Sequence, residues 1–291
     1  MRPRVAALVL ASGLVVSTLS GCSDAGDPGP EAGRRTPSPS ASSTAPEAAP
    51  TPGASAIAPP PALPPERACY RLDFDQALAA VSRAHPRPCD DEHTARTFAV
   101  GHVADLVDGP VGSIDGDKAQ RAVAEECPRR LAAFLGGPGQ ALRLSMFRPV
   151  WFTPTLAQAE SGADWYRCDV IALASEGTLA PLEGRLEGVL GRSADWKATY
   201  GLCATAEPGT EGFERVACGS PHTWRALTTV PIDAERYPGV DAVRDLGTTP
   251  CTDAARAVAD DALDFQWGYE WPSLEQWRAG RRYGVCWSPA S

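Results

Sequence analysis

The sequence predicts an α+β fold made of two tandem, small, disulfide-stapled domains. Each domain is expected to hold a mostly antiparallel sheet with one main helix and one short helix. Three observations support this fold class. Eight cysteines fall into two similar sets of four, β-rich segments follow a motif that both sets share, and apolar residues recur at helical spacing within each set.

Composition excludes several classes of protein before any motif is considered. The 291 residues carry a formal net charge of -9, with 43% hydrophobic and 22% charged residues. A nucleic-acid binder needs a basic face to neutralise phosphates, and a surface that binds anionic lipid by charge needs one too. We therefore expect no nucleic acid as a partner and no electrostatic membrane surface.

The N-terminus is predicted to direct export. Residues 1–21 begin with two arginines and continue into an apolar run, which is typical of a secretory signal peptide and short for a membrane span. The run ends in Leu-Ser-Gly-Cys, which resembles the lipobox of bacterial lipoproteins, with the cysteine at position 22. The resemblance implies a lipid on Cys22 and an anchor at the outer face of the cytoplasmic membrane. The alternative is an ordinary signal peptide with a chance cysteine.

A tether is expected between the lipid and the folded part. Residues 22–66 contain 12 prolines, 10 alanines and no aromatic residue. Such a segment buries too little apolar surface to offset the entropy of ordering, so we expect a disordered, semi-extended linker. Its reach is about 140 Å at roughly 3.1 Å per residue. The alternative is a proline-rich recognition ligand.

The remaining cysteines indicate an internal duplication. In an exported chain, eight cysteines predict a disulfide framework. Their gaps run 20, 38 and 41 residues in the first set and 15, 33 and 35 in the second, which places the copies at residues 67–185 and 186–291. We expect bridges to close within each copy, with three pairings open for each. The two sets are Cys69, Cys89, Cys127, Cys168 and Cys203, Cys218, Cys251, Cys286.

Residues around the cysteines repeat as well. Both copies contain Cys-x-x-x-His before a β-rich run, ending at His93 and at His222. Residues 154–158 read Pro-Thr-Leu-Ala-Gln, and residues 272–276 read Pro-Ser-Leu-Glu-Gln. A single offset of 118 residues relates this stretch to its counterpart as far as the fourth cysteine. The agreement predicts tandem duplication.

The elements of one copy follow in order from local patterns. Residues 94–103 and 223–230 are predicted strands because they are rich in Thr, Val and aromatics. Residues 117–135 and 252–263 are predicted helices from their apolar spacing, with Asp117 and Thr252 as N-caps. The segment 174–200 is left open, as a hinge or as a docked segment.

The second half of each copy is predicted to alternate strands with a short helix. Residues 142–152 are predicted as a strand with an irregularity at Pro149, and residues 265–271 are its partner in the second copy. The short helices begin at Pro154 and Pro272. They end at glycines, and residues 165–173 and 283–287 form the closing strands. The glycines are Gly162 and Gly280.

With these elements in place, the pattern resembles the septum-formation domain family of actinobacterial envelope proteins. The second copy carries the resemblance through its Cys-x-x-x-His motif, a Tyr-Pro-Gly turn at residues 237–239, and the series Pro272 to Trp277, Gly280, Arg282 and Cys286. The first copy departs: it lacks the turn and has Ala159 and Asp164 at the positions of the tryptophan and the arginine. The resemblance implies an exported, membrane-tethered domain linked to cell division, with no defined reaction.

Candidate functional residues are few. His93 and His222 fit a structural role, with the imidazole bonding a backbone carbonyl at the start of a strand; ligand contact and zinc binding are the alternatives. Trp267, Tyr269 and Trp271 share one strand face, which is either buried against the helix or offered to a ligand. No Gly-x-Ser-x-Gly element or phosphate loop is present. The acidic clusters fit a solvated surface better than catalysis or calcium binding, and they lie at residues 73–75, 90–92 and 115–117.

The leading hypothesis is a non-enzymatic, lipid-anchored envelope protein without a cofactor or metal. It would act as a binding or scaffold module in septum formation or envelope maintenance. Its partners would be the membrane, through the lipid, and another envelope protein or a wall polymer. The alternatives are a cell-wall glycan-binding module or weak hydrolase, and a metal-binding lipoprotein.

Overall fold

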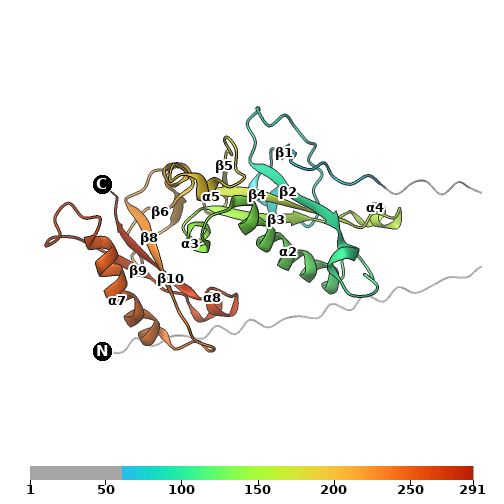
Figure 1. Ribbon diagram of the computed structural model, residues 1–291. Helices are drawn as coiled ribbons and strands as arrows, with labels where there is room; N and C mark the ends of the chain where they lie inside the picture. The colour runs from blue at the N-terminus through green and yellow to red at the C-terminus, as the bar shows by residue number, and fades with distance from the viewer. Residues whose placement is uncertain (1–60, 291) are drawn as a thin grey trace, which may run out of the picture. The chain divides into compact units, whose positions relative to one another are not determined.

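The computed structural model describes residues 61–290 (Figure 1). The predicted signal peptide, the lipid site at Cys22 and most of the predicted tether lie outside the described residues. The described residues all belong to one compact unit, which contains two five-stranded sheets. Within the described part, every helix is too short or too polar to cross a bilayer.

The first sheet has the order β1-β2-β4-β3, with β5 also paired to β4, and all its pairings are antiparallel. Its helix α2 lies along one face of the sheet (Figure 1). The strands are β1 Cys69–Tyr70, β2 Ala95–His102, β3 Phe147–Phe152, β4 Trp165–Ser175 and β5 Thr178–Ala180. The helices are α1 Phe74–Leu78, η1 Val103–Leu106, α2 Asp117–Leu135, α3 Gly139–Arg143 and α4 Leu156–Glu160.

The second sheet has the order β7-β6-β8-β10-β9, and it is also antiparallel throughout. Helix α7 packs against β8, β9 and β10. The strands are β6 Leu202–Ala204, β7 Arg215–Ala217, β8 Trp224–Pro231, β9 Gly268–Glu270 and β10 Tyr283–Pro289. The helices are α5 Val189–Arg192, α6 Trp196–Tyr200, α7 Val240–Arg256 and α8 Leu274–Arg278.

The two sheets share a strand order. Strands β1, β2, β4 and β3 correspond to β6, β8, β10 and β9, and each set carries its long helix on the same strands. The predicted α+β class with antiparallel sheets is confirmed. The tandem duplication and the boundary at residue 186 stay predictions, because the largest core cluster holds residues from both ranges, including Phe147 and Trp287.

Four disulfides close within the predicted copies. In each copy the first cysteine pairs with the second and the third with the fourth. The third cysteine lies on the long helix and the fourth on the central strand, so this bond fixes the helix to the sheet. The pairs are Cys69–Cys89, Cys127–Cys168, Cys203–Cys218 and Cys251–Cys286.

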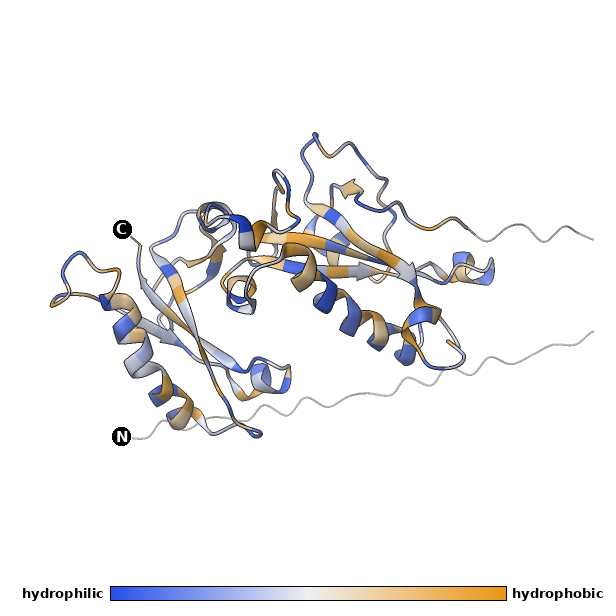
Figure 2. Ribbon diagram, in the orientation of Figure 1, coloured by the Kyte–Doolittle hydropathy of each residue, from blue (hydrophilic) through white to orange (hydrophobic). Residues whose placement is uncertain are grey.

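The segment between the sheets is docked. Its large apolar side chains are buried in the main core cluster, which also takes residues from β3, β4, β8 and β10. Backbone hydrogen bonds also join residues 144–146 to residues 200–202. Met146 N–H donates to the Tyr200 carbonyl and Leu202 N–H donates to the Leu144 carbonyl, both at 2.8 Å. Figure 2 shows hydrophobic residues concentrated along β4. The docked side chains are Leu182, Leu186, Leu190, Trp196 and Tyr200.

The largest error of the sequence prediction concerns helix α7. It begins at Val240 rather than at Thr252, and the Thr252 hydroxyl donates to the Thr248 carbonyl inside the helix. Gly247 and Pro250 both lie inside the helix. An added Cβ on Gly247 would lie 2.1 Å from the Tyr269 ring, so glycine lets the helix approach β9 closely.

Smaller corrections concern caps and one strand. The N-cap of α2 is Gly116 rather than Asp117. The short helices α4 and α8 each begin two residues later than expected. Their N-caps are Thr155 and Ser273, and each forms a capping box. Pro149 causes no irregularity, because among the described strands β3 pairs with β4 alone and the register runs unbroken through the proline.

Candidate functional site

Two hollows lie at corresponding places in the two halves of the fold. The first has a volume of about 790 Å³ and the second about 560 Å³. The first hollow is lined by Cys89, Glu92, His93, Arg96, Leu182 and Glu183, among others. The second hollow is lined by Trp196, Lys197, Cys218, His222, Arg225 and Leu227, among others.

One motif supplies the shared part of both linings. Residues 89–96 and 218–225 both read Cys-x-x-x-His-Thr-x-Arg, and in each the Cys, His and Arg line the hollow. The disulfide anchors the start of the motif to the strand β1 or β6, and the arginine lies on β2 or β8. Sequence reasoning found the cysteine and the histidine but not the arginine, although the arginine repeats at the same spacing.

Each histidine is oriented by its own backbone. Nδ1 of His93 lies 2.9 Å from the Asp91 carbonyl oxygen, and Nδ1 of His222 lies 2.8 Å from the Ser220 carbonyl oxygen. A carbonyl only accepts, so Nδ1 carries the proton and donates. This is the expected backbone bond at the start of a strand, and it leaves Nε2 as the free nitrogen of each ring.

Nε2 of His93 is a buried acceptor. The residue is 4% exposed, and Nε2 has no hydrogen-bond partner among residues 61–290. A buried polar atom without a partner costs about 1–3 kcal/mol. The neighbouring Arg96 has a buried Nε without a partner, and no carboxylate of the described chain lies within 4.0 Å of its guanidinium.

The two hollows differ in charge. The carboxylates of residues 90–92 and Glu183 line the first hollow, where they outnumber Arg96 and Arg185. The second hollow carries Lys197 and Arg225 against Asp195. Its remaining lining is largely apolar. The balance of charge is therefore negative at the first hollow and positive at the second.

The second hollow also brings together three residues with metal-ligand chemistry. Ligand atoms of Cys203, Cys218 and His222 lie within 4.8 Å of one another. Zinc needs cysteine thiolates, however, and in this structure the two sulfur atoms are joined in a disulfide. The oxidised chain therefore does not offer these cysteines to zinc.

The predicted aromatic stripe faces α7. Tyr269 is buried with the Cys251–Cys286 disulfide, and Trp267 and Trp271 are half-buried beside it. Burial raises the pKa of Tyr269 to about 12. Of the two interpretations of this stripe, packing against the helix fits the geometry better than an open ligand platform.

The acidic clusters have local structural roles. Asp73 caps α1, where its carboxylate accepts the backbone N–H of Gln76. Asp91 pairs with Arg87, Glu92 pairs with Arg71, and Asp115 accepts a hydrogen bond from Ser113. These contacts fit a solvated surface, and the hollow at residues 90–92 is the exception that brings carboxylates to a cavity.

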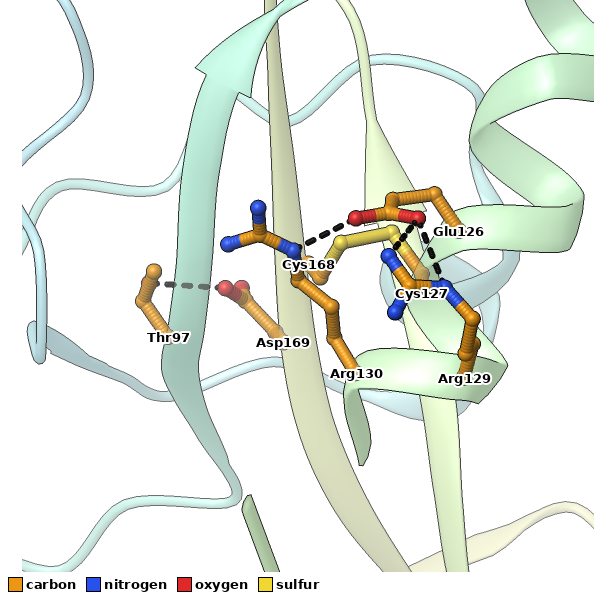
Figure 3. Close-up of a disulfide and its surroundings, with 7 residues drawn as sticks. All are labelled: Thr97, Glu126, Cys127, Arg129, Arg130, Cys168 and Asp169. Atoms are coloured by element: carbon orange, nitrogen blue, oxygen red, sulfur yellow. Dashed lines mark hydrogen bonds and ion pairs between the residues drawn. A yellow bond between two sulfur atoms is a disulfide. The ribbon is translucent and has the colours of Figure 1, made fainter. Parts of the chain in front are cut away.

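The sequence did not lead us to expect a buried ion pair in β4. Arg167 and Asp169, two residues apart on the strand, pair at 3.0 Å. Cys168 between them bonds to Cys127 of α2 (Figure 3). The Thr97 hydroxyl donates to Asp169 at 2.7 Å. On the α2 side, Glu126 accepts from Arg129 and Arg130. The alternation Arg-x-Asp within an apolar strand was the available signal.

Comparison with known proteins adds one finding. Residues 147–286 match the model of the Septum formation family. The septum-formation match extends from β3 to β10, so it includes the second motif at residues 218–225 and stops short of the first at residues 89–96. No curated protein and no solved structure matches the chain. The match supports the predicted resemblance to this family over residues 147–286, while a second copy and an actinobacterial origin stay predictions.

Proposed function

We propose that this chain is a non-enzymatic, lipid-anchored scaffold or binding protein of the cell envelope that acts in septum formation. The septum-formation match over residues 147–286 is the observation that carries the proposal. The four disulfides support an exported location, because disulfides persist in oxidising compartments.

A binding role accounts for the two hollows better than catalysis does. The histidines use Nδ1 to donate to backbone carbonyls rather than to a carboxylate. A nucleophilic mechanism requires a hydroxyl or thiol beside a base. The cysteine in each hollow is held in a disulfide, so it does not serve as that nucleophile.

Localisation tests the proposal. A fluorescent protein fused after residue 291 of the full chain is expected to concentrate at the division septum, and depletion of the chain should delay septation. The matched control carries the fluorescent protein directly after residue 66, so that it keeps the predicted signal, lipid site and tether. This control should spread around the whole envelope.

Two results would overturn the proposal. An even distribution of the full-length fusion would remove the septal role, and release of soluble fragments from isolated cell wall would remove the non-enzymatic role. The anchor has its own test: Cys22→Ser should abolish labelling by radioactive palmitate and move the chain from the membrane fraction to the soluble fraction.

A further inference from the structure

The repeated motif sets the same pair of groups into each hollow. One is the Nε2 acceptor of His93 or His222, which the Nδ1 bond to the backbone leaves free. The other is the guanidinium of Arg96 or Arg225, a donor without a carboxylate within 4.0 Å in the described chain. The ligand must therefore present a hydrogen-bond donor next to an acceptor.

The charged residues that line the two hollows also limit the class of ligand that both can bind. An anion suits Lys197 and Arg225 in the second hollow, but the carboxylates around the first hollow repel it. A cation suits the carboxylates of the first hollow but not Lys197 and Arg225 in the second. An uncharged ligand is the chemistry that both hollows accept.

The linings also specify the kind of uncharged group. Carboxylates such as Glu92 and Glu183 only accept hydrogen bonds, so the first hollow suits a ligand with several hydroxyl or amide donors. The second hollow adds the apolar surfaces of Trp196 and Leu227. A sugar ring has hydroxyls at its edge and an apolar face, and an N-acetyl group adds one amide donor and one carbonyl acceptor.

We infer that the two hollows are a pair of saccharide sites, each of which binds an uncharged N-acetylated sugar of a glycan. The histidine Nε2 accepts from a hydroxyl or amide of the sugar, and the arginine donates to a sugar oxygen. Two sites on one chain let it hold two sugars of one strand or bridge two strands, which raises the overall affinity for a polymer. The inference rests on the proposed function, since it names the ligand of an envelope-binding protein.

Calorimetric titration tests the inference. The full exported chain is purified in detergent, its four disulfides are verified by intact mass, and it is titrated with the β-1,4-linked tetramer of N-acetylglucosamine. We expect two sites per chain. His93→Ala and His222→Ala should each remove one site, and the double variant should lose both. His85→Ala alters an exposed histidine outside both hollows, so it should bind like the unaltered chain.

Because His93 is buried, its variant could fold poorly. Arg96→Gln and Arg225→Gln provide the second set, and each should weaken its own site about tenfold while the disulfides remain intact. Absence of sugar binding, or binding that survives both histidine variants, would overturn the inference. Competition by inorganic phosphate or by an oligomer of glucuronic acid would overturn it too, because the sites would then be anion sites.

The two proposals fail separately. Septal localisation without sugar binding overturns the saccharide sites and leaves the septal role in place. Sugar binding with an even envelope distribution overturns the septal role and leaves the saccharide sites in place.

Discussion

The guanidinium of Arg167 lies 3.0 Å from the carboxylate of Asp169, and the two side chains are only 5% and 0% exposed. The guanidinium also stacks 4.0 Å from the centre of the Tyr70 ring. At the corresponding positions of the second sheet stand Val285 and Trp287, which are buried in an apolar core. The same strand position therefore accepts either an ion pair or apolar side chains.

Breaking this ion pair should cost far more than replacing it. Arg167→Met leaves the buried carboxylate of Asp169 without its cation, so we expect a loss of about 3–5 kcal/mol in the free energy of unfolding at pH 7. The double variant Arg167→Met, Asp169→Leu should regain most of that loss. Denaturant unfolding measures both.

The exposed pair of Arg185 and Glu187 supplies the control for that experiment, because its atoms lie 3.2 Å apart, close to the 3.0 Å of the buried pair, but are in contact with water. Arg185→Met should change the free energy of unfolding by about 0–1 kcal/mol. A double variant at Arg167 and Asp169 that is no more stable than Arg167→Met alone would contradict the explanation.

Asp169 should also make stability depend on pH. Desolvation, opposed by Arg167 and Thr97, raises its pKa from 3.8 to about 6. A carboxyl whose native pKa lies above its unfolded value takes up its proton first in the native state. Its contribution to the free energy of unfolding therefore increases as pH falls from about 6 to 3.8, by up to about 3 kcal/mol.

The comparison with Asp169→Asn isolates this contribution. Asparagine keeps an acceptor for the Thr97 hydroxyl but does not titrate, while all other carboxylates remain the same in both proteins. The difference in stability between the two should shift in favour of the unaltered chain as pH falls from 7 to 4. A constant difference would show that Asp169 titrates with an ordinary pKa.

Gly247 should be intolerant of any side chain. A Cβ at this position would lie 2.1 Å from the Tyr269 ring on β9, and the Cys251–Cys286 disulfide holds α7 to the neighbouring strand β10. We expect Gly247→Ala to lower the free energy of unfolding by about 1–3 kcal/mol despite the better helix propensity of alanine. Gly139→Ala is the control, since nothing lies within 4 Å of the added methyl, and it should be neutral.

The sequence predicted what depends on local pattern. The bounds of α2 agree at residues 117–135 because its apolar spacing is uninterrupted. The predicted start of α7 was wrong: the helix also includes Gly247 and Pro250, and Gly247 fits there through close contact with Tyr269 on a strand distant in sequence.

The candidate site was predicted only in part for the same reason. The Cys-x-x-x-His spacing pointed to His93 and His222, but hollows arise from tertiary packing. Residues 181–185 form the wall of the first hollow opposite the motif, and residues 194–198 form that of the second. No local pattern indicates that these segments of the connection would form the opposite walls.

The four disulfides should differ in how fast they react with a reductant. Cys89 is exposed and Cys218 is half-buried, so each offers a sulfur to an attacking thiolate, whereas the cysteines on α2, α7, β4 and β10 are fully buried. Reduction proceeds by direct attack on a disulfide sulfur, so access controls its rate. Under native conditions, dithiothreitol should open Cys69–Cys89 and Cys203–Cys218 first. Alkylation at timed intervals followed by peptide mass mapping measures this order, with denatured chain as the control in which all four react together. Early labelling of Cys127 or Cys251 in the native chain would show that the helices detach from the sheets more readily than their burial implies.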